Sequence, residues 1–330
     1  MLVLTDEVGS AQPVIDEIER RGLPVAVIQP SEMSDKALRL SVFSDSRSRL
    51  HGLFRSPSGE VHARPGARIW KWKVAYPGHD SAIDVDPAVS EMKAAQYRAA
   101  LRAVWEIDAE WMNPYVAEQR LDQNKALGAV LARKCGLRVP DTVITDDPEV
   151  FKSFVQSLPQ SFVAVKAASA WAARRHDGSL VGAYTVKLSK PEAVALAESV
   201  RFAPVIAQPY IDKLYEIRVT CVASKFFACR IDSQANRGTE VDWRIYPDDP
   251  VGHSVLELRP EWRSMISRFM KAAGLLYGAI DFIMTPRGEL VFLEVNPAGQ
   301  YLWIEKLTGL PISAAIADWL CSAPNRVQQD

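Results

Sequence analysis

The sequence predicts an α/β protein whose C-terminal part is α+β, and three observations predict it. Residues 1–30 have the pattern of a strand, a helix and a strand, as in a βαβ unit. The middle of the chain alternates helical and extended segments. Strands of alternating apolar and polar residues follow, at 215–222, at 226–232 and in a later hairpin. We expect three units, with the boundaries 1–86, 87–204 and 205–330.

The first unit is expected to be structural. Its βαβ opening has a helix over Pro13–Arg21 that ends at Gly22. The G-x-G-x-x-G fingerprint of dinucleotide binding is absent, and Gly9 alone cannot cradle a pyrophosphate. Short strands are predicted between Leu40 and Trp72, and they end in the stretch Trp70-Lys71-Trp72-Lys73.

Helical spacing and end signals predict the main helices of the rest of the chain. We expect them at Pro87–Trp105, from Asp122 to a C-cap at Gly136, at Pro148–Leu158, at Glu261–Gly274 and at Ile312–Leu320.

Composition bounds the class of protein. The 330 residues are 48% hydrophobic, which is enough for two or three packed domains. The 39 basic and 40 acidic residues nearly cancel, so no global charge drives the chain toward nucleic acid or an anionic membrane. The four cysteines lack metal-ligand spacing and are expected to be buried thiols. No secretory signal and no long apolar run is present, so we expect a soluble, cytoplasmic protein.

The hairpin near the C-terminus gathers acidic side chains. Two apolar runs flank the turn cluster Thr285-Pro286-Arg287-Gly288. If Thr285 pairs with Gly288, Asp281 lies opposite Phe292, and Glu294 is its diagonal neighbour about 7–8 Å away. Residues two apart in a strand share a face, so we expect one face to hold Leu290, Phe292, Glu294 and Asn296.

Two carboxylates and an amide at one strand end suit a divalent metal. Buried carboxylates need cations or strong donors. Mg²⁺ binds through one or two carboxylates together with substrate phosphates. Asp281, Glu294 and Asn296 are therefore candidate Mg²⁺ ligands, and the alternative is a polar strand end that faces water.

The segment that ends this hairpin, FLEVNPAGQYLWIEKLTGLPI, resembles the signature that closes ATP-grasp ligases. Its extension Gly-Gln-Tyr-Leu-Trp is similar to graspetide (microviridin-type) ligases, which form side-chain esters and amides in ribosomally made peptides. The resemblance implies ATP, two Mg²⁺ ions, an acyl-phosphate intermediate and a precursor peptide with a leader segment. It also implies a pre-ATP-grasp domain over 1–86, linker helices with a central ATP-grasp subdomain over 87–204, and a C-terminal subdomain with the metal site over 205–330. We expect a homodimer.

Lysines are the candidate phosphate ligands. By the resemblance, Lys125 approaches the nucleotide phosphates, and the alternative is a solvated helix lysine. Lys166 ends an apolar strand on the same face as Phe162 and Ala164, so a phosphate is a suitable counter-charge. The alternative for Lys166 is a lysine at a sheet edge whose ammonium reaches water.

The apolar strand 205–211 resembles the hinge that reads the adenine edge in these ligases. The resemblance assigns Gln208, Tyr210 and Ile211 to adenine, and Glu216 or Asp212 to the ribose hydroxyls. A plain buried strand explains the hydrophobicity equally well.

Arginines are the candidate catalytic groups. Arg218 and Arg230 lie on neighbouring strands of a predicted hairpin, where guanidiniums can stabilise a phosphoryl group or an acyl phosphate. Ion pairs with Glu216 or Asp232 are the competing interpretation. By the resemblance to this subgroup, Arg244 is expected to contact the acyl acceptor or the substrate carboxylate.

Two segments depart from the family pattern. The flap expected after Lys166 has only Gly178 and Gly182, with Arg174-Arg175-His176 before them, so it is weak as a glycine-rich phosphate loop. The family's aromatic patch is followed by arginines, whereas lysines stand at Lys71 and Lys73 here.

The predicted function is an ATP-dependent, ADP-forming carboxylate ligase that crosslinks side chains of a precursor peptide. One alternative is an ATP-grasp ligase that joins an amino acid or small amine to a small-molecule or peptide carboxylate. An alternative of another class is an ATP-binding regulatory module without turnover.

Overall fold

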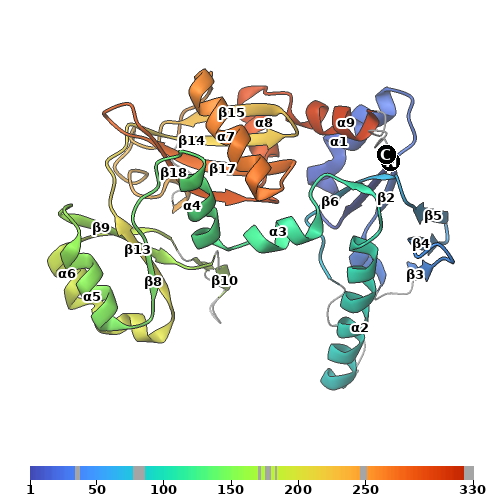
Figure 1. The fold of residues 1–330 in the computed structure, drawn as a ribbon, viewed down its shortest axis with the longest axis horizontal. Coiled ribbons are helices and arrows are strands. Elements are labelled where there is room, and N and C mark those ends of the chain that lie inside the picture. Colours follow the sequence, from blue (N-terminus) through green and yellow to red (C-terminus); the bar gives the residue numbers. More distant parts are fainter. Residues whose placement is uncertain are drawn as a thin grey trace.

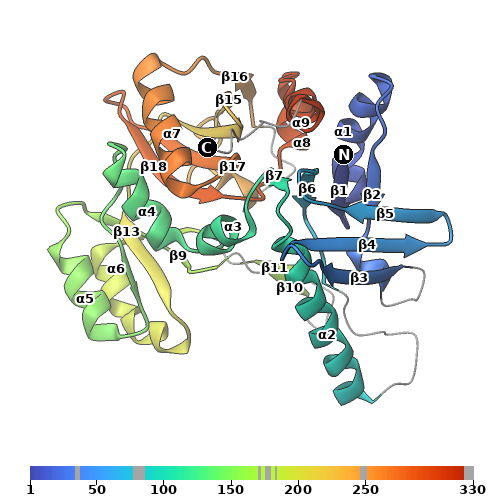
Figure 2. The ribbon, with the colours of Figure 1, turned by 45° about the vertical axis from the view of Figure 1, so that its right-hand side comes forward.

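A computed structural model describes residues 1–33, 38–76, 86–169, 172–174, 180–182, 184–245 and 251–322 of the chain. It confirms an α/β protein in which the C-terminal sheet is antiparallel. In Figures 1 and 2 the N-terminal sheets and the central sheet lie on opposite sides of the molecule, with the C-terminal sheet and the helices α3 and α4 between them.

The N-terminal part is built on a parallel sheet in the order β2-β1-β6-β7. Its elements are β1 (Leu2–Thr5), α1 (Val8–Arg20), β2 (Ala26–Ile28), η1 (Pro30–Met33), β6 (Arg68–Trp72) and β7 (Glu110–Trp111). The βαβ opening is confirmed, but α1 begins before Pro13, which lies inside the helix. A three-stranded meander and a helix that projects from the body complete this part: β3 (Arg39–Ser44), β4 (Leu50–Ser56), β5 (Gly59–Ala63) and α2 (Pro87–Trp105).

The aromatic stretch of β6 is core and not surface. Trp70 and Trp72 are each 1% exposed, and their rings stack with centroids 5.3 Å apart. Trp72 also packs edge-on against Tyr277 and Tyr301. β6 lies inside a parallel sheet, and such sheets are covered on both faces. The patch therefore joins the N-terminal sheet to the C-terminal part and does not present these two rings to a partner.

The central sheet has the order β12-β9-β13-β8 and is antiparallel. Its elements, with a separate two-stranded ribbon of β10 and β11, are β8 (Val143–Thr145), α5 (Pro148–Ser157), β9 (Phe162–Ala167), β10 (Ala172–Arg174), β11 (Leu180–Gly182), β12 (Val186–Ser189), α6 (Lys190–Ala195), η2 (Ala197–Phe202) and β13 (Val205–Pro209). The sequence boundary at 204/205 assigned β13 to the next unit, whereas its backbone pairs with β9 and β8.

The C-terminal sheet has the order β16-β15-β14-β17-β18. Its strands are β14 (Tyr215–Val222), β15 (Lys225–Ile231), β16 (His253–Val255), β17 (Tyr277–Met284) and β18 (Leu290–Asn296). Helices pack on one face of this sheet and leave the other face to line a cavity. The helices of this part are α3 (Tyr115–Leu121), α4 (Lys125–Lys134), η3 (Trp243–Ile245), α7 (Pro260–Ala273), α8 (Leu302–Thr308) and α9 (Ile312–Cys321).

One hydrophobic core joins the two ends of the chain. α9 packs against α1, and residues such as Val14, Trp72, Tyr277 and Ile316 belong to a single buried cluster. The central sheet has its own smaller core, which includes Phe151, Val163 and Ala207. Within the described ranges, no helix has the length and apolar character needed to cross a membrane.

Candidate active site

A cavity of about 320 Å³ lies between the central sheet and the C-terminal sheet. It is lined by every site residue predicted from the sequence except Arg230 and Asp212, the alternative to Glu216. The predicted residues that line it are Lys125, Lys166, Gln208, Tyr210, Ile211, Glu216, Arg218, Arg244, Asp281, Glu294 and Asn296.

The register of the acidic hairpin differs from the predicted one. Thr285 closes the turn with Glu289, not with Gly288, because the Thr285 amide donates to the Glu289 carbonyl at 3.0 Å. Farther along the ladder, a β-bulge shifts the pairing by one more residue. Asp281 therefore pairs directly with Glu294, and Phe292 pairs with Phe282.

The bulge also changes which side chains share a face. Leu293 is the extra residue, since Glu294 and Phe292 oppose consecutive residues of β17. Leu290 and Phe292 belong to the core under α7, whereas Glu294 and Asn296 line the cavity. The predicted common face of these four residues is wrong, because the bulge interrupts the two-residue alternation between Phe292 and Glu294.

Asp281 is held by an arginine of the adjacent strand. Arg218 is its cross-strand partner on β14, and the Arg218 Nη1 donates to both carboxylate oxygens, at 2.7 and 2.6 Å. Burial raises the pKa of Asp281, and the Arg218 guanidinium opposes that shift. The Nε of Arg218 is buried and has no partner among the described residues. This guanidinium therefore keeps donor capacity that a bound anion can use.

Glu294 is paired with Lys125, which reaches it from α4 at 2.9 Å. Asn124 caps α4 by accepting from the Leu127 amide, which fixes Lys125 at the first position of the helix. Burial acts to raise the pKa of Glu294, but Lys125 and Lys166 outweigh it and hold this pKa below its ordinary value. The predicted alternative of a solvated Lys125 does not describe this side chain, which is 23% exposed.

Lys166 is the lining cation without a partner. It projects from β9 into the cavity beside Ala164, and no hydrogen bond or ion pair engages its ammonium in the described part of the chain. Burial lowers the pKa of Lys166 to about 8, and the nearby Glu294 only partly offsets this. A buried ammonium without a fixed counter-ion is an anion-binding group.

The hinge residues lie at one end of the cavity. The Gln208 side chain is buried and donates to the Thr142 hydroxyl at 2.9 Å. The Tyr210 amide donates to the Phe162 carbonyl, and the centroid of the Tyr210 ring lies 4.0 Å from the Lys187 ammonium. No hydrogen bond engages the backbone of Ile211 within the described segments, so its amide and carbonyl can meet the edge of a base.

Glu216, and not Asp212, faces the cavity. Lys213 pairs with Glu216 at 2.5 Å and also donates to the Val241 carbonyl. Burial raises the pKa of Glu216, with Lys213 opposing. Asp212 is exposed and lies outside the cavity lining.

The predicted arginines separate into two groups. Arg244 lines the cavity and makes two hydrogen bonds to the buried Asp242, at 2.8 and 2.7 Å. Arg230 is a cross-strand partner of Ile217, on the face of the sheet opposite Arg218. It pairs with Asp232 at 2.6 Å and lies over the Tyr215 ring. The alternative of a structural ion pair thus describes Arg230, and we do not carry it forward as a catalytic group.

Two positioning residues were not found from the sequence. The buried amide of Asn113 donates to the carbonyls of Tyr277 and Pro297 and accepts from the amides of Leu276 and Tyr277. It therefore ties the start of β17 to the loop that follows Asn296. The only signal was an Asn-Pro pair between helices, and its partners are more than a hundred residues away in sequence.

Gly299 closes the same loop against the sheet. A Cβ at this position would lie 2.5 Å from the Ala279 Cβ and 3.0 Å from the Arg218 Nη2. The Tyr277 hydroxyl donates to the Gly299 carbonyl at 2.6 Å. Only glycine lets the loop approach Arg218 this closely.

The donor set fits Mg²⁺. Asp281, Glu294 and Asn296 present oxygen atoms from adjacent strands, which hard divalent cations prefer. Among the described residues, no three His, Cys, Asp or Glu side chains cluster as metal ligands. Mg²⁺ does not need three, because substrate phosphates and water complete its octahedron.

The expected flap falls mostly outside the described residues. Arg175, His176 and Gly178 are not described, and Arg174 and Gly182 are described only as backbone of β10 and β11.

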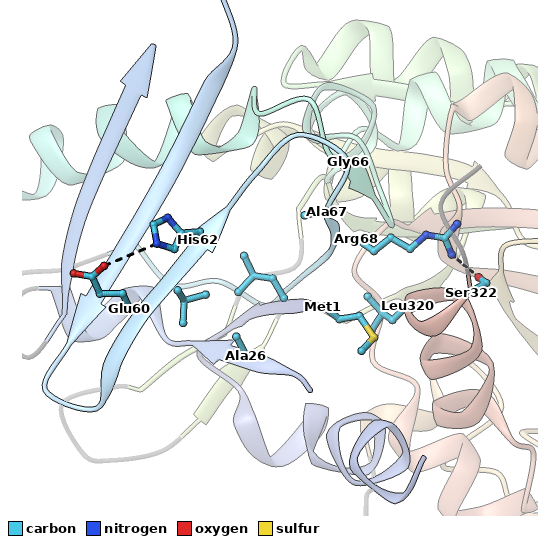
Figure 3. A pocket seen from close by; sticks show the side chains of 11 residues that line it. Met1, Ala26, Glu60, His62, Gly66, Ala67, Arg68, Leu320 and Ser322 are labelled. Atoms are coloured by element: carbon cyan, nitrogen blue, oxygen red, sulfur yellow. Dashed lines mark hydrogen bonds and ion pairs between the residues drawn. The ribbon is translucent and has the colours of Figure 1, made fainter. Parts of the chain in front are cut away.

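A second cavity, of about 430 Å³, lies between the N-terminal sheets and α9 (Figure 3). Its buried Arg68 is bonded to Glu110 and to the Ser322 hydroxyl. On the opposite side, the His62 Nε2 on β5 lies 3.9 Å from the Glu60 carboxylate. Because Arg68 is paired with Glu110 and Glu60 is paired with Arg55, we place the chemistry in the cavity between the central and C-terminal sheets.

Comparison with solved structures shows that the chain has the ATP-grasp fold. The chain superposes on the RiPP-associated ATP-grasp ligase of Chryseobacterium gregarium with a TM-score of 0.86 and 26% identity, over 97% of this chain and 96% of that one. That ligase was solved in complex with ADP and a leader and core peptide.

Two macrocyclases of Microcystis aeruginosa MRC are also similar over 97% of this chain and 98% of theirs. MdnB has a TM-score of 0.76 and 26% identity. MdnC, bound with precursor peptide MdnA, has a TM-score of 0.82 and 24% identity. Within the ATP-grasp fold, the chain thus resembles RiPP-associated ligases over nearly its whole length.

Sequence comparison reaches less of the chain. Probable alpha-L-glutamate ligases of Shewanella sp. strains MR-4 and MR-7 are 30% identical over 120 residues. The match covers 36% of this chain and 38% of the length of those relatives. No protein-family model matches.

Proposed function

We propose that this chain is an ATP-dependent carboxylate ligase acting on a ribosomally made precursor peptide. It would phosphorylate Asp or Glu side chains and join them to Ser, Thr or Lys side chains as ester or amide crosslinks. The observation that carries the proposal is one cavity that holds Lys125 and Lys166 beside Asp281, Glu294 and Asn296. The Chryseobacterium gregarium ligase, with its ADP and peptides, supports the choice of substrate.

The chemistry follows from charge and position. The substrate carboxylate attacks the γ-phosphorus of ATP and yields an acyl phosphate and ADP. The acceptor then attacks the acyl carbon, and inorganic phosphate leaves. Lys125 and Lys166 would hold the phosphates, and Arg218 and Arg244 would orient the acyl phosphate. Mg²⁺, held by Asp281, Glu294 and Asn296, would neutralise triphosphate charge.

The decisive experiment is mass spectrometry of a precursor peptide co-expressed with the protein. We expect the loss of one water per bond, together with ADP release that depends on the peptide. Binding of ATP without ADP release for any acceptor would favour a regulatory module.

A second candidate is ligation of free glutamate, which the partial match to alpha-L-glutamate ligases favours. Incubation with Mg-ATP, free glutamate and a peptide separates the two. Glutamate transfer adds glutamyl residues to the peptide, whereas crosslinking only removes water. The homodimer and the cytoplasmic location remain predictions.

A further inference from the structure

The three-stranded meander leaves one edge of its sheet open. β3 pairs with β4 along its whole length and with no other described strand, so the backbone groups on its far side have no strand partner. β3 has six residues with an unbroken register, and Arg39 at its first position is its one charged residue. Proline, lysine and a bulge are among the devices that keep a strand edge from pairing with another chain, and β3 has none of them.

The other sheet edges in the described part of the chain are shorter or covered. The strands β2, β7, β8, β10, β11, β12 and β16 have two to four residues each. β5 has five residues, among them Glu60 and His62. β18 has seven, but Arg138 pairs with Val291 at its outer edge, and the Arg138 carbonyl accepts from the Phe292 amide at 2.8 Å. β3 is therefore the longest edge strand without cover among the described sheets.

Two side chains of β3 are poorly accommodated in a single chain. Leu40 packs against the core, and side chains alternate along a strand, so Arg39 and Phe43 face outward. Phe43 is 53% exposed. Arg39 lies directly opposite Arg55 of β4, and like charges in this arrangement are destabilising. Arg55 is bonded to Glu60 at 2.7 Å, whereas Arg39 has no hydrogen bond or ion pair to any described residue.

A second copy of the chain fits this edge in a register that satisfies both side chains. When a strand pairs antiparallel with its own copy about a two-fold axis, opposite residues must lie on the same face of the sheet. With Val42 on the axis, Arg39 lies opposite the partner's Asp45, and the two Phe43 rings are diagonal neighbours about 7–8 Å apart, within reach of each other. An axis at Ser41 gives neither contact.

The helix α2 reaches over the same edge. Its C-terminal half, including Leu101 and Val104, packs in the core behind the meander, and α2 contacts both β3 and β4. Its first turns extend beyond β3, on the side away from β4 (Figures 1 and 2). Val89 and Met92 lie on these turns and are 43% and 53% exposed. A copy paired with β3 would lie beside these turns and cover apolar side chains that the single chain leaves in water.

We propose that β3 is a contact between two copies of this chain, which pair antiparallel about a two-fold axis at Val42 and join their two three-stranded sheets into one. The sequence predicts a homodimer without placing its contact, and this edge supplies one. The interface is isologous, so each of its contacts occurs twice. It lies away from the cavity between the central and C-terminal sheets, and the inference is therefore independent of the proposed function.

Sedimentation velocity of the full-length protein tests the contact. We expect a dimer at micromolar concentration, and Phe43→Lys should raise its dissociation constant by about 100-fold or more, because a lysine opposes edge pairing and enters the interface twice. Phe202→Lys is the matched control, since Phe202 is 94% exposed on η2, beside the central sheet. It should dimerise as the wild type does. A monomeric wild type, or an unchanged dissociation constant in Phe43→Lys, overturns the proposal.

A charge reversal tests the predicted ion pair. Arg39→Glu sets an acidic side chain opposite the partner's Asp45, so we expect the dissociation constant of the dimer to rise by about tenfold at low salt and by less at high salt. Arg64→Glu is the control, because Arg64 is exposed and follows β5 at the other edge of the meander. Equal dimerisation of Arg39→Glu and the wild type overturns this register.

Single cysteines locate the axis. Opposite residues of an antiparallel pair have Cβ atoms about 4.5–5.5 Å apart, so Val42→Cys should form a disulfide-linked dimer under mild oxidation. Ser44 lies opposite the partner's Leu40 and about 14 Å from its own copy, so Ser44→Cys should not. The wild type controls for its own thiols, three of which are buried. A crosslink through Ser44→Cys, or none through Val42→Cys, overturns the proposal, whether or not the protein has ligase activity.

Discussion

Glu294 and Asp281 lie on neighbouring strands, but substituting them leaves different cations without a partner. Asp281→Ala would leave the buried Arg218 without its partner, and an uncompensated buried charge costs about 3–5 kcal/mol. Glu294→Gln keeps the shape of the side chain and leaves only Lys125 unpaired, at a partly exposed site. Glu294 is therefore the better residue for separating chemistry from folding.

We expect Glu294→Gln to lower ADP release by about 10²-fold or more, with a melting temperature close to that of the wild type. The matched control is Glu289→Gln, because Glu289 lies on the same hairpin but pairs with Arg138 away from the cavity. Steady-state ADP release and thermal unfolding check both variants. Full activity of Glu294→Gln would remove the basis of the metal site.

If Lys166 binds phosphate as proposed, nucleotide binding should depend on pH. Its pKa of about 8 means that it is mostly protonated at pH 7 and mostly neutral at pH 9. The protonated form is the one that attracts phosphate, so the Kd for Mg-ADP should rise by about tenfold between these two values of pH. Isothermal titration calorimetry measures it. Lys166→Arg stays charged and should show a flat profile, and the same slope in both proteins would contradict this role.

A substitution at Gly299 would test how closely the loop after Asn296 must approach the sheet. Gly299→Ala places a Cβ against Ala279 and Arg218, so we expect a loss of about 1–3 kcal/mol of stability and weaker turnover. Gly9→Ala is the control, since a Cβ there meets no atom within 4 Å. Urea unfolding compares the two variants. Wild-type stability and activity of Gly299→Ala would show that the loop can move away.

At the scale of elements, Asn113 joins β17 to the loop after β18. Asn113→Ala removes four hydrogen bonds to backbone groups and leaves buried groups unpaired, so we expect a loss of about 2–4 kcal/mol. Asn113→Asp keeps the acceptor but turns an oxygen toward two carbonyls, and it should be at least as damaging. Denaturant unfolding gives the values. A loss below about 1 kcal/mol would mean that water replaces the amide.

Local patterns predicted most elements but not the face that each side chain takes. α2, α5 and β14 lie where spacing and end signals place them. The bulge at Leu293 has no local signal, because it lies in the continuous apolar run from Leu290 to Leu293, and only pairing with β17 reveals the extra residue. The face of the sheet on which Arg230 lies depends in the same way on the pairing register of β15 with β14. Trp70 and Trp72 alternate with lysines, yet they are buried because β6 lies inside its sheet.

Within the candidate site, the chemistry of residue types was more predictable than their partners. Lys125, Lys166, Asp281 and Glu294 were expected from charge in apolar surroundings and from the family resemblance, and the cavity contains all four. Asn113 and Asp242 were missed, because their roles depend on contacts that form only in the folded chain.

At the scale of the whole molecule, the central sheet has a core separate from the one that unites α1, α9 and the C-terminal sheet. We expect amides of the central sheet strands β8, β9, β12 and β13 to exchange with solvent at a lower opening free energy than amides of β14 or β17. Under the proposed function Mg-ADP would bind between the two sheets, so at 100 times its Kd it should raise the opening free energy of these amides by about 2.7 kcal/mol. Hydrogen–deuterium exchange measures it, and uniform protection without nucleotide would contradict two separate cores.

The loop that follows Asn296 also has a consequence for engineering. Gln300 donates to Glu7 and to the Ser10 hydroxyl, and the Tyr301 hydroxyl donates to the Ser10 carbonyl, so this loop rests on α1. α9 packs against the same helix. A chimera that swaps the first domain between related ligases would set a foreign surface under the loop. Such a chimera should therefore also exchange the segment from Gly299 to Cys321, so that α1 and the segment that packs on it come from the same protein.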